Sequence, residues 1–151
     1  MTKYEQLEKK TESLGICIHN FKFSDTKKAA YREIGGYKAV ILDESAIETT
    51  CEKTVLLSHE LAHYETGTVH SLGDIVNSPL VKMNRRKDEA KANRHSIQVL
   101  LPFEELQKSI SRCCDMFEVA EMSGVTVDFL FEAIDFYKTQ NKNLKFPDNT
   151  P

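Results

Sequence analysis

The chain has 151 residues, of which 40% are hydrophobic and 28% charged, the composition of a folded globular protein. This length fits one domain with a hydrophobic core that needs no disulfide bridges. The net charge of −3 excludes a global basic field that would attract nucleic acid or anionic lipid. No apolar run approaches the ~20 residues that span a bilayer, and the first residues are polar and acidic. We therefore expect a cytoplasmic protein without membrane contact.

The N-terminal third predicts one helix and a small sheet. Residues 7–14 have helical spacing, and residues 16–18 resemble a short strand. Residues 29–34 and 37–42 flank Gly35-Gly36, a pair that favours a tight β-hairpin turn. We expect a helix followed by a small, mostly antiparallel sheet.

A central helix is predicted over residues 50–66, a stretch without Gly or Pro. Thr49 is the expected N-cap, and Glu52, three residues on, completes a capping-box pattern. Gly67 can end the helix. Apolar residues lie on several sides of this segment, so we expect it to be largely buried.

The C-terminal half is predicted to be helical after a loop over residues 69–79. Three helices are expected, over residues 86–101, 104–122 and 127–138. We expect a single domain over residues 1–138 and a flexible tail over residues 139–151. The four cysteines show no CxxC spacing, so we interpret them as free and structural: Cys17, Cys51, Cys113 and Cys114.

The segment His59-Glu60-Leu61-Ala62-His63 lies within the predicted central helix. Positions i and i+4 share a helix face, so His59 and His63 can both direct an imidazole nitrogen at one zinc ion. Glu60 lies beside that face, where it can take a proton from a water that the ion acidifies. Composition alone predicts roughly 0.016 chance matches to HExxH in this chain. A metal site therefore explains the pattern better than two core histidines, which would need other polar partners.

A catalytic zinc ion usually has a third protein ligand, and three residues are candidates. His70 follows a glycine, but it lies one residue too far along for the pattern HExxHxxGxxH. Asp74 is a further candidate. Glu89 is favoured, because it begins a stripe of small and apolar residues, Glu89, Ala92, Ser96 and Leu100, that would let its helix approach the central helix closely.

Taken in order, three segments resemble the ImmA/IrrE metallopeptidase family: His59-Glu60-Leu61-Ala62-His63-Tyr64, Glu89-Ala90-Lys91-Ala92-Asn93 and Leu100-Leu101-Pro102. The resemblance implies one zinc ion held by His59, His63 and Glu89, with Glu60 as general base. It also implies a protein substrate, a helix-turn-helix repressor of a prophage or other mobile element. The chain departs from the family at His95-Ser96, where a phenylalanine-alanine pair is usual.

Two further patterns have plainer explanations. Residues 118–135 have helix-turn-helix spacing, but the second helix would carry Asp128, Glu132 and Asp135, which DNA phosphates repel. We therefore expect no direct nucleic-acid binding. The basic run over residues 82–94 is interpreted as a solvated helix start.

The sequence thus predicts an α+β, zincin-like domain, with the sheet packed on the HExxH helix. The expected function is a zinc-dependent endopeptidase of narrow specificity. One alternative is a zinc-containing protein that binds and regulates a repressor without cleaving it, and another is the toxin partner of an antitoxin. The donor that stabilises the oxyanion stays open between Tyr64 and His70.

Overall fold

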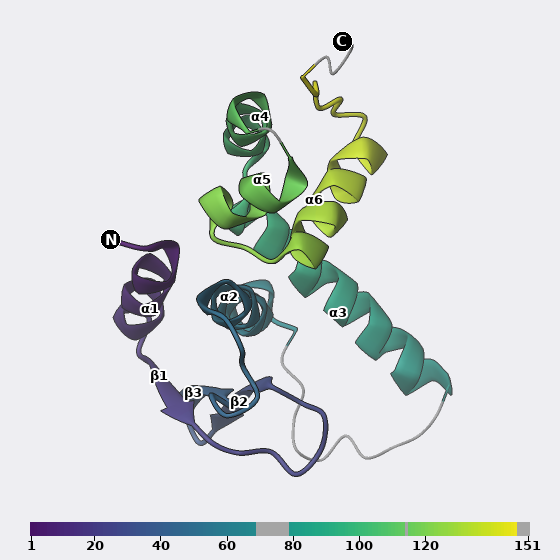
Figure 1. Cartoon of the computed structure of the whole chain (residues 1–151). Helices are drawn as coiled ribbons and strands as arrows, with labels where there is room; N and C mark the ends of the chain where they lie inside the picture. Colours follow the sequence, from purple (N-terminus) through teal and green to yellow (C-terminus); the bar gives the residue numbers. More distant parts are fainter. Residues whose placement is uncertain (69–78, 114, 148–151) are drawn as a thin grey trace.

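The computed structural model of the chain describes residues 1–68, 79–113 and 115–147, which form an α+β fold with a three-stranded mixed sheet and six helices. Helices α1 (Lys3–Ser13) and α2 (Thr50–Thr66) lie on the same side of the sheet (Figure 1). The long helix α3 (Pro79–Leu100) crosses α2, and the last three helices gather around its C-terminal end. Within these ranges, no helix is long and apolar enough to cross a membrane.

The sheet contains β1 (Ile16–Asn20), β2 (Ala29–Ile34) and β3 (Tyr37–Leu42), in the spatial order β1-β3-β2. The predicted hairpin at Gly35-Gly36 is confirmed, and it pairs β2 with β3 in antiparallel register. β1, however, runs parallel to β3, so the sheet is mixed rather than mostly antiparallel. The two-residue turn makes β2 and β3 neighbours, but no local signal determines on which side of them β1 pairs.

Strand β2 is an edge strand, and its main-chain groups alternate between β3 and the free edge. Lys28 and Asp43 lie opposite each other, one residue beyond the paired residues Ala29 and Leu42. Asp43 N donates to Lys28 O at 2.8 Å, so Lys28 and Asp43 form a hydrogen-bonded pair. Alternate positions therefore bond to β3, and the N–H and C=O groups of Ala29, Tyr31 and Glu33 point away from it. The register thus leaves a row of peptide groups along the free edge of β2.

Helix α2 spans the predicted residues, and both of its ends are capped. Thr49 Oγ1 accepts a hydrogen bond from Glu52 N at 3.1 Å, and Gly67 takes the left-handed conformation with φ 70°. The Glu52 carboxylate lies 2.6 Å from Lys28 Nζ, so it binds the sheet side of the molecule instead of completing the predicted capping box. Leu57 and Leu61 of α2 are buried in the core.

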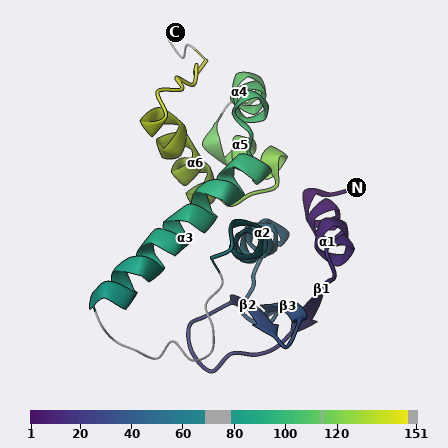
Figure 2. The same cartoon turned by 180° about the vertical axis from the view of Figure 1, so that it is seen from behind.

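Helix α3 begins at Pro79, seven residues before the predicted start. Proline is well suited to the first turn of a helix, where its missing N–H has no partner to lose, so Pro79 starts the helix instead of breaking it. Ala92, Ser96 and Leu100 are buried, as the predicted stripe requires. The N-terminal half of α3 projects away from the other described elements (Figures 1 and 2).

The helix predicted over residues 104–122 is two helices, α4 (Phe103–Arg112) and α5 (Met116–Ser123). Asp115 separates them, because its side chain caps α5 by accepting a hydrogen bond from Glu118 N at 2.9 Å. Helix α6 (Val127–Thr139) confirms the last predicted helix. Of its aromatic residues, Phe129 and Tyr137 are buried, whereas Phe131 is 49% exposed.

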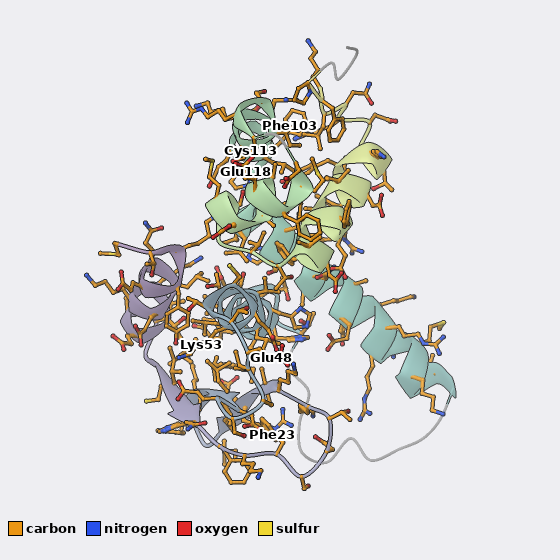
Figure 3. All side chains as sticks on the ribbon, viewed as in Figure 1. Phe23, Glu48, Lys53, Phe103, Cys113 and Glu118 are labelled. Atoms are coloured by element: carbon orange, nitrogen blue, oxygen red, sulfur yellow. The ribbon has the colours of Figure 1, made fainter. Side chains whose placement is uncertain are left out.

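The segment between β1 and β2 is held to the end of β3 by Asp43. The Asp43 carboxylate accepts hydrogen bonds from Phe23 N at 3.1 Å and from the main-chain N–H and hydroxyl of Ser45. Phe23 is labelled in Figure 3. These bonds lower the pKa of Asp43, with the Ser45 hydroxyl contributing most. The segment that leads into β2 is therefore anchored to the sheet.

Candidate metal centre

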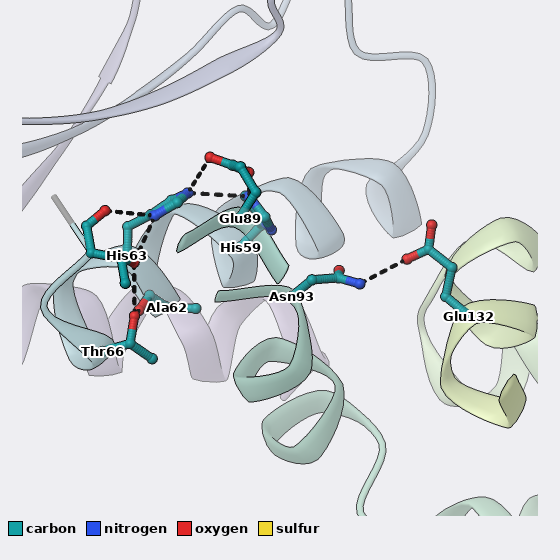
Figure 4. A network of polar contacts seen from close by, with 8 residues as sticks. His59, Ala62, His63, Thr66, Glu89, Asn93 and Glu132 are labelled. Carbon is teal, nitrogen blue, oxygen red and sulfur yellow. Dashed lines mark hydrogen bonds and ion pairs between the residues drawn. The ribbon is translucent and has the colours of Figure 1, made fainter. Parts of the chain in front are cut away.

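The structure brings together the side chains of His59, His63 and Glu89, the three predicted ligands (Figure 4). His59 Nε2 lies 2.8 Å from Glu89 Oε2, and His63 Nε2 lies 3.1 Å from Glu89 Oε1. The two imidazole Nε2 atoms are 3.2 Å apart. Three potential donor atoms, from two helices distant in the sequence, thus converge on one point.

The two histidines lie one turn apart on α2, as the helical period requires. Their rings meet edge to face, with centroids 4.8 Å apart. The His63 side chain is only 6% exposed, whereas that of His59 is 24% exposed. The α2 part of the cluster therefore extends from the buried interior to the surface.

Glu89 reaches this face because α2 and α3 pack closely. Ser58 Oγ and Ser96 Oγ are 2.8 Å apart in the buried interface, and Ala92 is fully buried beside them. Small side chains at these positions allow the two backbones to approach. The serine at position 96, where the resembled family usually has alanine, thus fits a helix contact that also contains Ser58.

Thr68 orients His63, a role that the sequence analysis did not anticipate. His63 Nδ1 lies 3.0 Å from Thr68 O and 2.9 Å from Thr68 Oγ1, so an Nδ1–H can donate to both oxygens. Nε2 is then the nitrogen with a lone pair for a cation. The left-handed turn at Gly67 folds Thr68 back against the last turn of α2, where Thr68 N donates to His63 O at 2.9 Å. The glycine was the signal in the sequence that could have located this partner.

The carboxylate of Glu89 and the imidazole of His63 stabilise each other's charge. Hydrogen bonds from His59 and His63 hold the pKa of Glu89 far below its usual range. Burial alone would lower the pKa of His63, but the hydrogen bond and charge of Glu89, with the charge of Glu60, raise it overall. The cluster is therefore anionic at Glu89, which favours a positive charge beside it.

Glu60 lies beside the cluster and near the edge of the sheet, since it and Tyr31 line the same cavity. Burial raises the pKa of its carboxyl, and the charges of His59 and His63, with a smaller contribution from the Tyr31 N–H, partly offset that rise. The Tyr31 N–H is one of the groups that face the free edge of β2. The side chain predicted to move a proton therefore lies at that edge.

A cavity of about 230 Å³ opens between β2 and the two ligand-bearing helices. Its described lining includes Glu60, His63, Thr68 and Glu89 on the helix side. The remaining lining residues come from the start of β2 and the segment before it: Lys27, Ala29, Ala30, Tyr31 and Arg32. The cluster is therefore reached from a space bounded by the edge strand.

The other sequence candidates are not part of this arrangement. His70 and Asp74 lie outside the described residues, as does Cys114. The Tyr64 ring packs 6.0 Å from that of Tyr31, and its hydroxyl lies 3.4 Å from Lys38 Nζ. Tyr64 is thus directed at the sheet and is not among the residues that line the cavity.

The donor set fits a metal ion. The donor atoms lie within 4.8 Å of one another, and the three closest separations are 2.8, 3.1 and 3.2 Å. Bonds of about 2.0–2.1 Å to a tetrahedral ion would place neighbouring ligand atoms roughly 3.3–3.4 Å apart. Among the described residues, His59, His63 and Glu89 are the one such cluster, and they can hold a metal ion.

Compared with protein-family models, curated proteins and solved structures, the chain has no significant match. The resemblance to the ImmA/IrrE family therefore rests on the motif residues themselves.

Proposed function

We propose that the protein is a zinc-dependent endopeptidase with a zincin-like site. The observation that carries the proposal is the convergence of His59, His63 and Glu89 beside Glu60, at a cavity that borders an edge strand. Two histidines and one glutamate are a ligand set of catalytic zinc sites, which keep one position open. Structural zinc sites are closed by four protein ligands, whereas the Glu89 side chain here is 51% exposed.

When bound, zinc supplies Lewis acidity, which acidifies water and polarises a carbonyl group. Glu60 takes the proton from the attacking water and delivers it to the nitrogen of the leaving amine. Thr68 holds the imidazole of His63.

The substrate that suits this cavity is an extended polypeptide. Ala29 and Glu33 present main-chain N–H and C=O groups along the free edge of β2, where a peptide can add as another strand. Between them, the Tyr31 carbonyl already accepts a hydrogen bond from Arg32 Nη1. The ordered motifs support an ImmA/IrrE-type substrate, a helix-turn-helix repressor of a prophage or other mobile element. Such a substrate places the activity in the cytoplasm.

The test is to incubate the zinc-supplemented protein with its cognate helix-turn-helix repressor and to analyse the products by mass spectrometry. We expect fragments from the wild type and none from Glu60→Gln, with equal zinc content in both. Glu65→Gln, on the same helix but ion-paired with Lys10, is the matched control and should cleave normally.

Two outcomes would contradict the proposal. Fragments that still form with Glu60→Gln would show that Glu60 is not the proton carrier. Release of the repressor from DNA that survives Glu60→Gln, without fragments, would favour the binding protein that regulates without cleavage.

A further inference from the structure

Two cationic residues are among the described residues that line the cavity beside the metal cluster. Lys27 precedes β2, and Arg32 lies within it; both line the cavity. We propose that the peptide held along β2 is acidic, with an Asp or Glu side chain paired with Lys27 and Arg32. This inference rests on the peptidase function proposed above and names the substrate class of that site.

The guanidinium of Arg32 lies at the edge where the peptide would bind. Arg32 Nη1 donates to Tyr31 O at 2.8 Å, and that carbonyl is one of the groups directed away from β3. A guanidinium has five N–H donors, so this bond uses a small part of its capacity. A carboxylate can engage two N–H groups at once, which makes a side chain beside the edge a well-matched partner.

Lys27 differs from its neighbour Lys28, although the two have the same side chain. Lys28 Nζ forms an ion pair with Glu52 at 2.6 Å. Lys27 is exposed and lines the cavity, while its main-chain N–H is held by Asp25 Oδ1 at 2.8 Å. Within residues 1–68, 79–113 and 115–147, the ion pairs formed leave Lys27 and Arg32 without a carboxylate partner.

In the described lining of the cavity, the negative residues are Glu60 and Glu89, and Glu89 is bound by the two imidazoles. Glu33, next along the edge, has its carboxylate 3.4 Å from the Tyr31 hydroxyl and is not among the described lining residues. Once a divalent cation is bound, positive charge exceeds negative charge in the described lining. An acidic substrate is therefore attracted, and a basic one is repelled.

A peptide fits these features better than a nucleic acid does. The edge of β2 presents alternating donors and acceptors, which another peptide chain can pair and a sugar-phosphate backbone cannot. The cationic groups are also few, whereas a nucleic-acid surface presents many along one face. A single-stranded oligonucleotide is thus the competing ligand for the test.

The test is an NMR titration of zinc-supplemented Glu60→Gln protein, which prevents turnover, with two short peptides. One alternates Thr and Glu, and the other alternates Thr and Gln. We expect saturable amide shifts at Ala29, Tyr31 and Glu33, and about fivefold tighter binding of the Glu peptide, as expected for two solvent-accessible ion pairs. The double variant Lys27→Glu/Arg32→Glu should remove or reverse that preference. Lys108→Glu, an exposed position on α4, is the control and should keep it.

Several results would overturn the inference. Equal affinity for the two peptides, no saturable shifts on β2, or tighter binding of oligothymidylate at the same amides would each do so. Shifts confined to the exposed basic residues of α3, Lys82, Arg86 and Lys87, would also contradict it. Repressor cleavage without a preference for the Glu peptide would support the peptidase function and contradict the acidic substrate. A preference for the Glu peptide without repressor cleavage would support an acidic ligand and contradict the peptidase function.

Discussion

The two helices that supply the candidate ligands are built differently. Helix α2 is capped at both ends, packs against the sheet, and holds His63 at 6% exposure with its imidazole oriented by Thr68. Among the described side chains of helix α3, only those in its C-terminal half are buried, and Glu89 is 51% exposed. One half of the site is thus preorganised by the fold, and the other half depends on how α3 lies against α2.

This difference would give a bound metal ion two roles. A cation at the cluster would complete the coordination of two histidines that are already in place. It would also tie the exposed part of α3 to the rest of the domain through Glu89, because binding to the native state stabilises that state. The relative contributions of the two helices can be measured.

The largest effect is expected from His63→Ala. Loss of partners outside the ligand set already costs 10–100-fold in metal affinity, so loss of this buried ligand should cost more than about 100-fold. Glu89→Ala should cost less, because water can take the place of an exposed carboxylate. Zinc affinity measured by competition with a chelating dye tests this order.

His95→Ala is the matched control, since His95 lies on α3 with Nε2 3.6 Å from Glu65 Oε2, outside the cluster. It should bind zinc as the wild type does. Full zinc binding by Glu89→Ala together with loss in His70→Ala would show that Glu89 is not the third ligand.

The packing of α3 on α2 should respond strongly to Ala92→Leu. Ala92 is fully buried in this interface, so the larger side chain should destabilise the fold by about 1–3 kcal/mol and displace Glu89 from the histidines. Urea unfolding and zinc affinity are the measurements. Ala90→Leu, at an exposed position on the same helix, should change stability by about 0.5 kcal/mol or less. Equal effects of the two substitutions would contradict the packing argument.

A smaller effect is expected from Thr68→Val, which removes the hydroxyl that contacts His63 Nδ1 but keeps the main-chain carbonyl. Zinc affinity should fall by about tenfold, the lower end for residues that orient a metal ligand without binding the metal. Thr54→Val, a buried threonine near the start of α2, is the control and should leave zinc affinity unchanged. An unchanged affinity in Thr68→Val would assign the orientation of His63 to Thr68 O alone.

The smallest effect concerns the sheet side of the site. Asp43→Asn should destabilise the metal-free protein at neutral pH, because the Asp43 carboxylate accepts several hydrogen bonds that favour its charged form. The pKa of Asp43 is lower in the folded state than in the unfolded state. Its charge therefore stabilises the fold above the unfolded pKa of about 3.9, and this stabilisation is lost as pH falls through the folded-state pKa. The stability difference from wild type should therefore shrink below about pH 4 in denaturant titrations.

Asp135→Asn, at an exposed position on α6, controls for the loss of one negative charge. If the stability difference between Asp43→Asn and wild type stays constant down to acidic pH, then packing, and not the charge of Asp43, causes the destabilisation.

Much of the fold could be predicted from local signals. The hairpin at Gly35-Gly36, the caps Thr49 and Gly67, and the span of α2 are set by residues adjacent in the sequence, and all are confirmed. The predicted start of α3, at residue 86, was wrong because Pro79 serves as the first helical residue. The break before α5 was missed although Asp115, with Glu118 three residues later, has a capping pattern.

By itself the sequence determined that His59 and His63 share a helix face with Glu60 beside it, because the helical period leaves no other arrangement. Its small residues also predicted a close approach of α3, which brings Glu89 to the histidines. Only the tertiary structure decided that Glu60, Lys27 and Arg32 line one cavity beside the cluster. These contacts depend on strand order and register, which arise from packing between distant segments and leave no periodic signal along the chain.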